Sequence, residues 1–226
     1  MSGRRAALFD IDGTLVDSVY THVAAWRDAF ADNDLTLPHW EIHRRIGKDG
    51  GILVSELVEI ADGDTGSDDL ESRLSDAHDR FYSERSEGLT VLPGARDLVR
   101  EAQRLGMVVV LATSAPDHEL DLLRRLLDVD DLVDAVTSGA DVETAKPDST
   151  IVGIALDRAG VEAADAVMIG DATWDFVAAS DRGVPGVGVL TGGVGRGELL
   201  QAGAGAVFRD AAEVIASGIL GSGDRR

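Results

Sequence analysis

Acidic side chains stand directly after apolar segments of this chain, at places where they could do chemistry. Asp10 and Asp12 come at the end of the first apolar run, Asp171 ends a later one, and Asp175 lies four residues further on. Carboxylates brought together at one site cannot all ionise unless a cation lies among them. Oxygen ligands of this kind suit Mg²⁺, above all where phosphate is received. The pattern predicts a magnesium site built from these four residues.

A hydroxyl pair and a lysine occur at comparable positions. Thr113 and Ser114 follow an apolar run, and Lys146 precedes Pro147 between two predicted helices. Each of these residues could have only a local role, since Asp, Ser and Thr commonly cap helices or occupy turns. Local roles do not explain why such residue types recur, in order, at one edge of a predicted sheet. We therefore treat them and the carboxylates as one candidate site.

The segments that must position these residues alternate between strand and helix. Strands are predicted at 5–11, 107–113, 134–138, 166–171 and 184–190. Helices are predicted between them, at 95–105, 117–127, 148–159 and 173–182. This alternation is typical of a parallel sheet with right-handed crossovers. In such a sheet ligands bind beyond the carboxyl ends of the strands, which is where most of the candidate residues stand.

Residues 17–89 differ from the rest because they contain no clear strand. Val19, Val23, Trp26 and Phe30 recur at spacings of three and four, as on an amphipathic helix. Further helices are predicted at 38–46, 51–61 and 67–86. We therefore predict an α/β protein with a doubly wound, Rossmann-like parallel-sheet core and an inserted all-helical cap domain. The core comprises residues 1–15 and 90–226, and the cap comprises residues 16–89.

Composition excludes several classes of protein. The 226-residue chain has a formal net charge of −20, which disfavours nucleic acid and anionic membranes as partners. It has no cysteine, which excludes thiolate nucleophiles, disulfides and cysteine-bound metals. No apolar run reaches the roughly 20 residues of a membrane span. The N-terminal apolar run is broken by aspartates, unlike a secretory signal, so we expect a cytoplasmic protein.

Four short motifs resemble those of a known family. FDIDGTLVDS (9–18) and GDATWD (170–175) look like the first and fourth motifs of the haloacid dehalogenase superfamily of phosphohydrolases. LATS (111–114) and KPD (146–148) are similar to the second and third. The predicted helical insert is similar to that family's helical cap, so the resemblance covers essentially the whole chain. Within the family, the chain resembles the branch of phosphoglycolate phosphatases and β-phosphoglucomutases.

The resemblance implies a covalent mechanism. Asp10 would be the nucleophile that forms an aspartyl-phosphate, and Asp12 would protonate the leaving oxygen and later activate water. Lys146 would neutralise charge on the nucleophile and on the phosphoryl group. Family members that cleave halides or phosphonates lack an acid at the position of Asp12. This residue therefore favours a phosphate ester as the substrate.

The resemblance also implies how phosphate and metal are held. The phosphoryl oxygens would be bound by Thr113 or Ser114, helped by backbone N–H groups near Gly13 and Ala115. Asp10, Asp171 and the carbonyl of Asp12 would bind Mg²⁺. Asp175 would be a further ligand, or a support for the ligands.

Three residues of the predicted cap are candidates for substrate recognition. Lys48 is one of only two lysines and follows Gly47 in a loop that, in capped family members, reaches toward the core. It could bind an anionic group of the substrate, or it could be a solvated loop residue. His22 and Trp26 resemble the corresponding pair in β-phosphoglucomutases, where they lie at the boundary between cap and core. They could equally form a packed helix face, with His22 satisfied by a neighbour.

The predicted function is that of a Mg²⁺-dependent phosphatase acting on a small phosphorylated metabolite, such as phosphoglycolate or a sugar phosphate. A phosphosugar mutase is the alternative. Against it, the loop after Gly47 lacks the arginine of the mutases, and the fourth motif begins with Gly170 instead of glutamate. A catalytically silent binding protein on the same fold is a third hypothesis, which the intact motifs oppose. We expect a monomer or a homodimer.

Overall fold

The computed structural model describes residues 4–61, 68–141 and 146–221. Parts of the predicted core, at 1–3, 142–145 and 222–226, and of the predicted cap, at 62–67, lie outside the described residues. Six strands form one sheet in the order β5-β4-β1-β6-β7-β8, and every neighbouring pair is parallel. The strands are β1 (Ala6–Phe9), β4 (Val108–Ala112), β5 (Ala135–Thr137), β6 (Ala166–Gly170), β7 (Gly186–Val189) and β8 (Ala204–Phe208).

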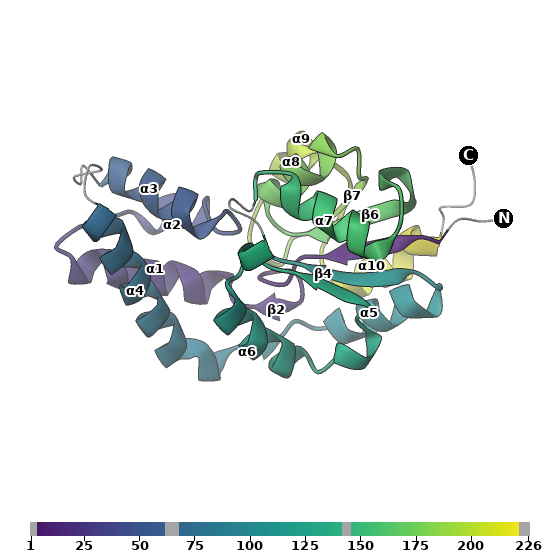
Figure 1. Ribbon diagram of the computed structural model, residues 1–226, viewed down its shortest axis with the longest axis horizontal. Helices are drawn as coiled ribbons and strands as arrows, with labels where there is room; N and C mark the ends of the chain where they lie inside the picture. Colours follow the sequence, from purple (N-terminus) through teal and green to yellow (C-terminus); the bar gives the residue numbers. More distant parts are fainter. Residues whose placement is uncertain (1–3, 62–67, 142–145, 222–226) are drawn as a thin grey trace.

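Helices cover both faces of this sheet (Figure 1). Alternate residues of a strand point to opposite faces, so Leu8 packs with α7 and α8 while Phe9 packs with α5, α6 and α10. These helices are α5 (Ala95–Arg104), α6 (Asp117–Leu127), α7 (Thr150–Ala159), α8 (Thr173–Asp181) and α10 (Ala211–Ser217). A further helix, α9 (Arg196–Ala202), packs Leu199 against Phe176 and Val207. The predicted doubly wound α/β core is confirmed.

The register of the central strands brings the candidate residues to one edge. Phe9 of β1 is paired with Leu111 of β4 on one side and with Ile169 of β6 on the other. The residues that follow these three positions therefore emerge side by side. This is the physical reason why three motifs distant in sequence share one site.

A helical cap stands beside the sheet domain (Figure 1). Its helices are α1 (Val19–Asp32), α2 (His39–His43), α3 (Gly50–Ile60) and α4 (Asp68–Arg85). They enclose a core of their own, with Trp26, Phe30, Leu57 and Leu74 among its buried side chains. None of the helices described in the structure is long and apolar enough to cross a membrane.

The connection between cap and sheet departs from the prediction. Strand β2 (Val16–Asp17) pairs antiparallel with β3 (Thr90–Val91), so the expectation that residues 17–89 contain no strand is wrong at Asp17. A two-residue strand carries too little periodicity to be recognised in a sequence. The sequence also did not predict β8, α9 or α10, which are short segments of five, seven and seven residues. The predicted helix 38–46 ends earlier, at His43, and the chain then turns before Gly47, which has a positive φ of 89°.

Candidate active site

Lys146 and two carboxylates form the innermost part of the site. The Lys146 Nζ donates a hydrogen bond to Asp10 Oδ1 at 2.6 Å and lies 2.7 Å from Asp175 Oδ1. The side chains of Lys146, Asp10 and Asp175 are all buried. Asp175 Oδ2 also accepts the backbone N–H of Ala172 at 3.0 Å, so both oxygens of Asp175 are engaged. Asp175 thus holds Lys146 in position beneath Asp10.

Burial shapes the charges of this group. It raises the pKa of Asp10 to about 8, although Lys146 acts in the opposite direction. Burial alone would lower the pKa of Lys146, but Asp10 and Asp175 raise it above its usual value. One ammonium therefore serves two carboxylates, and it cannot offset both negative charges when both carboxyl groups are ionised.

Asp171 adds a third carboxylate to the same place. The side chain accepts a hydrogen bond from Thr14 Oγ1 at 2.8 Å, and burial raises its pKa well above the usual value. Backbone closes around it so tightly that a Cβ on Gly192 would lie 1.7 Å from Asp171 Oδ2, and one on Gly13 would lie 2.4 Å away. Only glycine is compatible with such close approach.

These carboxylates fit a divalent cation. One oxygen from each of Asp10, Asp171 and Asp175 lies within 4.8 Å of the others, and all three residues are buried. Three buried carboxylates with one lysine are short of positive charge, and a hard cation with oxygen ligands supplies it. The donor set therefore suits a divalent cation with oxygen ligands, and Asp10 and Asp171 are the two carboxylates not already held by both of their oxygens.

Asp12 stands apart from this group and has different partners. The Asp12 Oδ1 accepts a hydrogen bond from Ser18 Oγ at 2.5 Å and lies 3.4 Å from His22 Nε2. Burial alone would raise the pKa of Asp12, but the hydrogen bonds from His22 and Ser18 lower it. The pKa values of the two neighbouring carboxyl groups, Asp10 and Asp12, are therefore displaced in opposite directions.

A cavity of about 450 Å³ lies between cap and sheet. Of the residues singled out in the sequence, it is lined by Asp10, Asp12, His22, Trp26, Lys48, Thr113, Ser114 and Ala115. Gly13, Lys146, Asp171 and Asp175 are not among its lining residues, and Asp171 borders a smaller pocket shared with Asp12. The cavity thus joins the predicted nucleophile and the predicted acid to the cap residues.

Two of the predicted phosphate-binding amides have partners within the protein. The N–H of Gly13 donates to the carbonyl of Val16 at 2.8 Å, and the N–H of Ala115 donates to Thr113 Oγ1 at 3.0 Å. A phosphate group would have to replace these bonds. The hydroxyl of Ser114 lies 3.5 Å from the carbonyl of Gly47, where the cap loop meets the core.

Lys48 lies where the cap loop meets the core, but its positive charge is already paired with a carboxylate of the protein. Its ammonium pairs with Glu56 and sits 4.2 Å from the ring centroid of Trp174, with only 8% of the side chain exposed. The next residue, Asp49, donates its N–H to the carbonyl of Lys146 at 2.6 Å. The cap loop is therefore bound directly to the backbone of Lys146. The sequence did not indicate Glu56 or Trp174, although Trp174 lies within the fourth motif.

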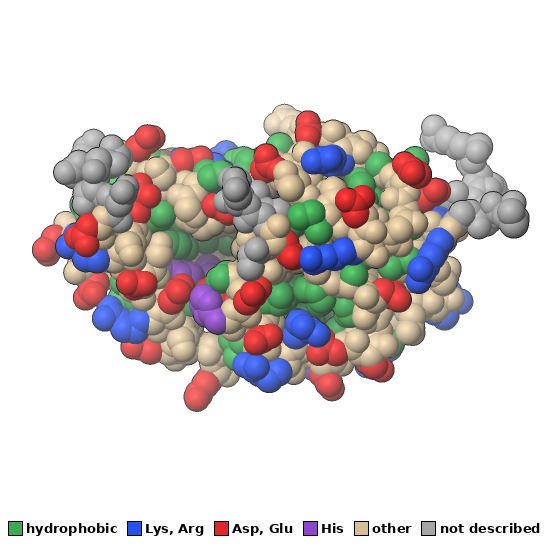
Figure 2. All heavy atoms as spheres, in the orientation of Figure 1, with side chains coloured by type: hydrophobic (Ala, Val, Ile, Leu, Met, Phe, Trp, Pro, Cys, Tyr) green, Lys and Arg blue, Asp and Glu red, His purple; other side chains and the backbone are tan. Residues whose placement is uncertain are grey.

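His22 and Trp26 belong to a buried aromatic stack. The ring of His22 lies over Tyr82 with 4.1 Å between centroids, and Trp26 lies over His78 at 4.2 Å. Beside this stack are Glu119 and His118 at the start of α6. Sequence reasoning missed His78, Glu119 and His118, because only the fold brings α4 and α6 together. Figure 2 shows histidine atoms in the hollow between these two helices.

The fold and the site define a class of enzymes with a Rossmann-like sheet, an acidic strand-edge site and a helical cap above it. A family model described as haloacid dehalogenase-like hydrolase matches residues 4–183. The chain belongs to this family, and the resemblance carried by its four motifs is confirmed.

Individual relatives fall in the predicted branch. The chain is 32% identical over 216 residues to a phosphoglycolate phosphatase of Rhodospirillum rubrum, covering 93% of this chain and 89% of that one. A crystal structure of a hydrolase from Pseudomonas syringae superposes with a TM-score of 0.89 at 33% identity, covering 94% and 97% of the two chains. A β-phosphoglucomutase from Clostridium difficile shares the fold, with a TM-score of 0.85 at 18% identity and 98% coverage of both chains.

Proposed function

We propose that this protein is a Mg²⁺-dependent phosphatase that hydrolyses a small phosphate monoester through an aspartyl-phosphate intermediate. The observation that carries the proposal is that Asp10 and Asp12 line the same cavity. Asp10 is backed by Lys146, and Asp12 is held by Ser18 and His22. Membership of a hydrolase family and a relative named as a phosphatase support the same activity.

In the first half of the reaction, a carboxylate oxygen of Asp10 attacks phosphorus. The bond from phosphorus to the leaving oxygen breaks, and Asp12 gives that oxygen a proton. Lys146 reduces the repulsion between the attacking carboxylate and the phosphate. In the second half, Asp12 takes a proton from water, whose oxygen attacks phosphorus and releases Asp10 and inorganic phosphate.

Asp10, Asp171 and the carbonyl of Asp12 would hold Mg²⁺, and Asp175 would fix Lys146. When bound, the cation would supply positive charge that screens the nucleophile from the substrate dianion. The side chains of Thr113 and Ser114 line the cavity beside Asp10 and would bind the phosphoryl oxygens. Gly13 and Ala115 would contribute their N–H groups if the present bonds to Val16 and Thr113 are exchanged.

The substrate belongs to the class of phosphoglycolate or sugar phosphates. The relative from Rhodospirillum rubrum carries the name of the first of these. Lys48 and His22 would contact the leaving group, because both line the cavity on its cap side. The cytoplasmic location and the monomeric or dimeric state remain predictions from the sequence.

A phosphosugar mutase is the second candidate, favoured by His22 and Trp26 at the boundary between cap and core. Both enzymes would form the same intermediate on Asp10 and would differ in what attacks it next. Supplying β-glucose 1-phosphate with a trace of the 1,6-bisphosphate separates them. We expect inorganic phosphate without glucose 6-phosphate if this sugar is accepted. Rapid glucose 6-phosphate with little phosphate would make the protein a mutase.

The main test is release of inorganic phosphate from a panel of phosphorylated metabolites and from an aryl phosphate. We expect turnover that stops on exhaustive treatment with EDTA and returns when Mg²⁺ is added. Full activity after chelation would remove the metal from the proposal. No phosphate release from any ester would leave the silent binding protein as the better hypothesis.

A further inference from the structure

A second buried polar cluster lies on the cap side of the cavity. Its members are His22 on α1, His78 on α4 and Glu119 on α6, and one ligand atom from each lies within 4.8 Å of the others. All three side chains are buried. Two belong to cap helices and one to a helix that covers the sheet. In the proposed phosphatase chemistry only His22 has a task, through Asp12 and the leaving group, whereas His78 and Glu119 have none.

The two imidazoles face each other through one nitrogen each. His22 Nδ1 lies 3.1 Å from His78 Nε2. The outer nitrogens both face carboxylates, since His22 Nε2 is 3.4 Å from Asp12 and His78 Nδ1 is 3.2 Å from Asp79. If each outer nitrogen carries the proton that it donates, both inner nitrogens present lone pairs to each other. Such a contact is repulsive unless a proton or a metal cation lies between them.

The geometry around the two imidazoles suits a metal ion. Burial lowers the pKa of His78 to about 4. Burial alone would also lower the pKa of His22, but its hydrogen bond with Asp12 raises that pKa, so a metal ion bound here would displace the proton of His22. Donation of the outer N–H to a carboxylate is how metal-binding histidines are usually held. Two nitrogens bound to one tetrahedral Zn²⁺ stand about 3.3 Å apart, close to the separation found here.

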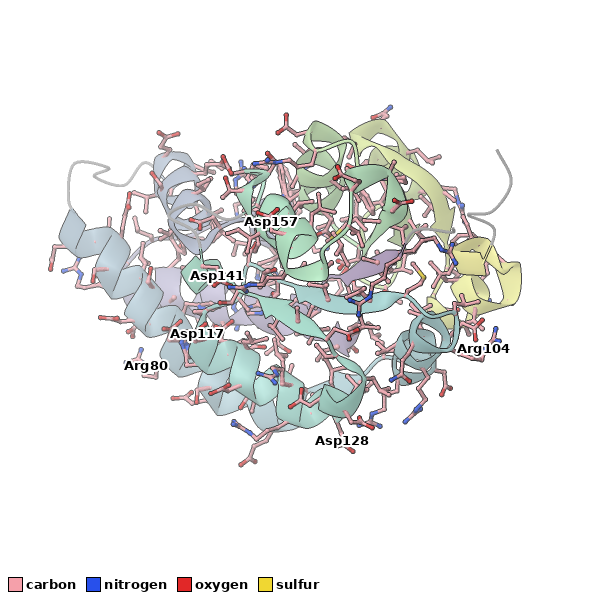
Figure 3. The ribbon with its side chains drawn as sticks, turned by 45° about the vertical axis from the view of Figure 1, so that its right-hand side comes forward. Arg80, Arg104, Asp117, Asp128, Asp141 and Asp157 are labelled. Carbon is pink, nitrogen blue, oxygen red and sulfur yellow. The ribbon has the colours of Figure 1, made fainter. Side chains whose placement is uncertain are left out.

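Glu119 supplies the third group. Its side chain is buried and lines the cavity, and no residue in the described part of the chain hydrogen-bonds to its carboxyl group. Burial raises its pKa to about 7, which a nearby cation would reverse. Asp79 and His118 form an overlapping group with Glu119, again within 4.8 Å. In Figure 3 the start of α6, marked by Asp117, lies near α4, which carries Arg80.

We propose that His22, His78 and Glu119 bind one divalent transition-metal ion of the Zn²⁺ class, separate from the Mg²⁺ site. Two nitrogens and one carboxylate, with a fourth position open to the cavity, form a donor set typical of zinc. Magnesium prefers oxygen ligands, which the strand edge offers instead. Because its ligands come from α1, α4 and α6, the ion joins the cap to the sheet domain. Bound zinc therefore holds the two together and slows turnover, a consequence that rests on the proposed phosphatase activity.

The test is direct binding to the full chain in the presence of saturating Mg²⁺. Titration with Co²⁺ should produce the visible absorption of a four- or five-coordinate ion at one equivalent, and Zn²⁺ should displace it. Glu119→Gln and His78→Ala should each weaken Co²⁺ binding at least tenfold. Asp79→Asn should weaken it by about 10–100-fold, as expected for the loss of a carboxylate that holds a metal-binding histidine. His39→Ala, which removes an exposed histidine of α2, is the matched control and should bind as the parent does.

Two results would overturn the proposal. One is the absence of a Co²⁺ band in the parent chain. The other is a band that survives Glu119→Gln but disappears in Asp171→Asn, because the ion would then occupy the strand edge. Thermal melting of each variant checks folding, and the near-isosteric Glu119→Gln decides the matter if His78→Ala does not fold. A chain that binds Co²⁺ but releases no phosphate when supplied with Mg²⁺ alone would contradict the proposed function and leave this site standing.

Discussion

The two buried polar clusters that meet at the cavity are built from different groups on different supports. At the sheet edge, Asp10, Asp171 and Lys146 follow parallel strands or pack beneath them, and oxygen ligands dominate. On the cap side, nitrogen ligands dominate, and His22 and His78 stand on helices. A sheet edge keeps its groups at fixed distances, whereas groups shared by cap and sheet depend on where the cap lies. The comparison suggests that chemistry belongs to the first cluster and control to the second.

Asp10→Asn gives the largest expected effect. The amide keeps the shape of the side chain but cannot form an acyl-phosphate, so phosphate release should fall by at least about 10⁴-fold. Circular dichroism and the melting temperature should stay close to those of the parent. The matched change in the other cluster, Glu119→Gln, should retain most activity toward an aryl phosphate. Comparable losses in both variants would erase the distinction between the two clusters.

Lys146→Met tests the electrostatics of the sheet edge. Removing the ammonium leaves Asp10 and Asp175 buried without their shared partner, which should cost about 3–5 kcal/mol of unfolding free energy. Urea denaturation measures this loss. Lys48→Met is the control, and its loss should be no more than about 1 kcal/mol because Glu56, its partner, is partly exposed. Equal losses of unfolding free energy in the two variants would mean that charge does not hold Lys146, Asp10 and Asp175 together.

His22→Asn measures how far the cap cluster assists the sheet edge. Asp12 would lose its histidine partner, so the pKa of Asp12 should rise toward its usual value. We expect kcat to fall roughly 10–100-fold, less than the 10²–10⁴-fold effect of a complete acid–base catalyst. KM should change little, and the acidic limb of the kcat profile should move to higher pH. An unchanged pH profile would show that Asp12 does not depend on His22.

Lys48→Ala has the smallest expected effect. If the ammonium leaves Glu56 to contact the leaving group, kcat/KM for the preferred metabolite should fall by up to about tenfold, the value of one hydrogen bond to a charged group. Turnover of an aryl phosphate, which uses only the phosphoryl site, should not change. Identical behaviour toward both esters would return Lys48 to a structural role in the loop.

The same difference between clusters explains what the sequence could predict. The candidate residues at the sheet edge follow buried strands or lie in short motifs, so strand pattern and motif alone are enough to group Asp10, Asp12 and Asp171. His78 and Glu119 occupy ordinary helical positions, and only the packing of α4 near α6 makes them neighbours. Lys48 was predicted as a candidate for substrate recognition, but nothing in the sequence indicated that it pairs with Glu56. Short elements such as β2 and β8 were missed because too few residues establish a period.

The small ribbon of β2 and β3 has an evolutionary consequence. Val16 stands opposite Val91 and Asp17 opposite Thr90, so the chain leaves the sheet domain and returns to it at adjacent backbone positions. For the sheet, everything between these strands is one long hairpin loop, and doubling such a loop costs only about 0.6 kcal/mol in closure entropy. Helices can therefore be lengthened, exchanged or replaced there without disturbing the strands that carry Asp10 and Asp171. New substrate preferences can arise in the insert while the proposed phosphoryl-transfer groups are inherited unchanged.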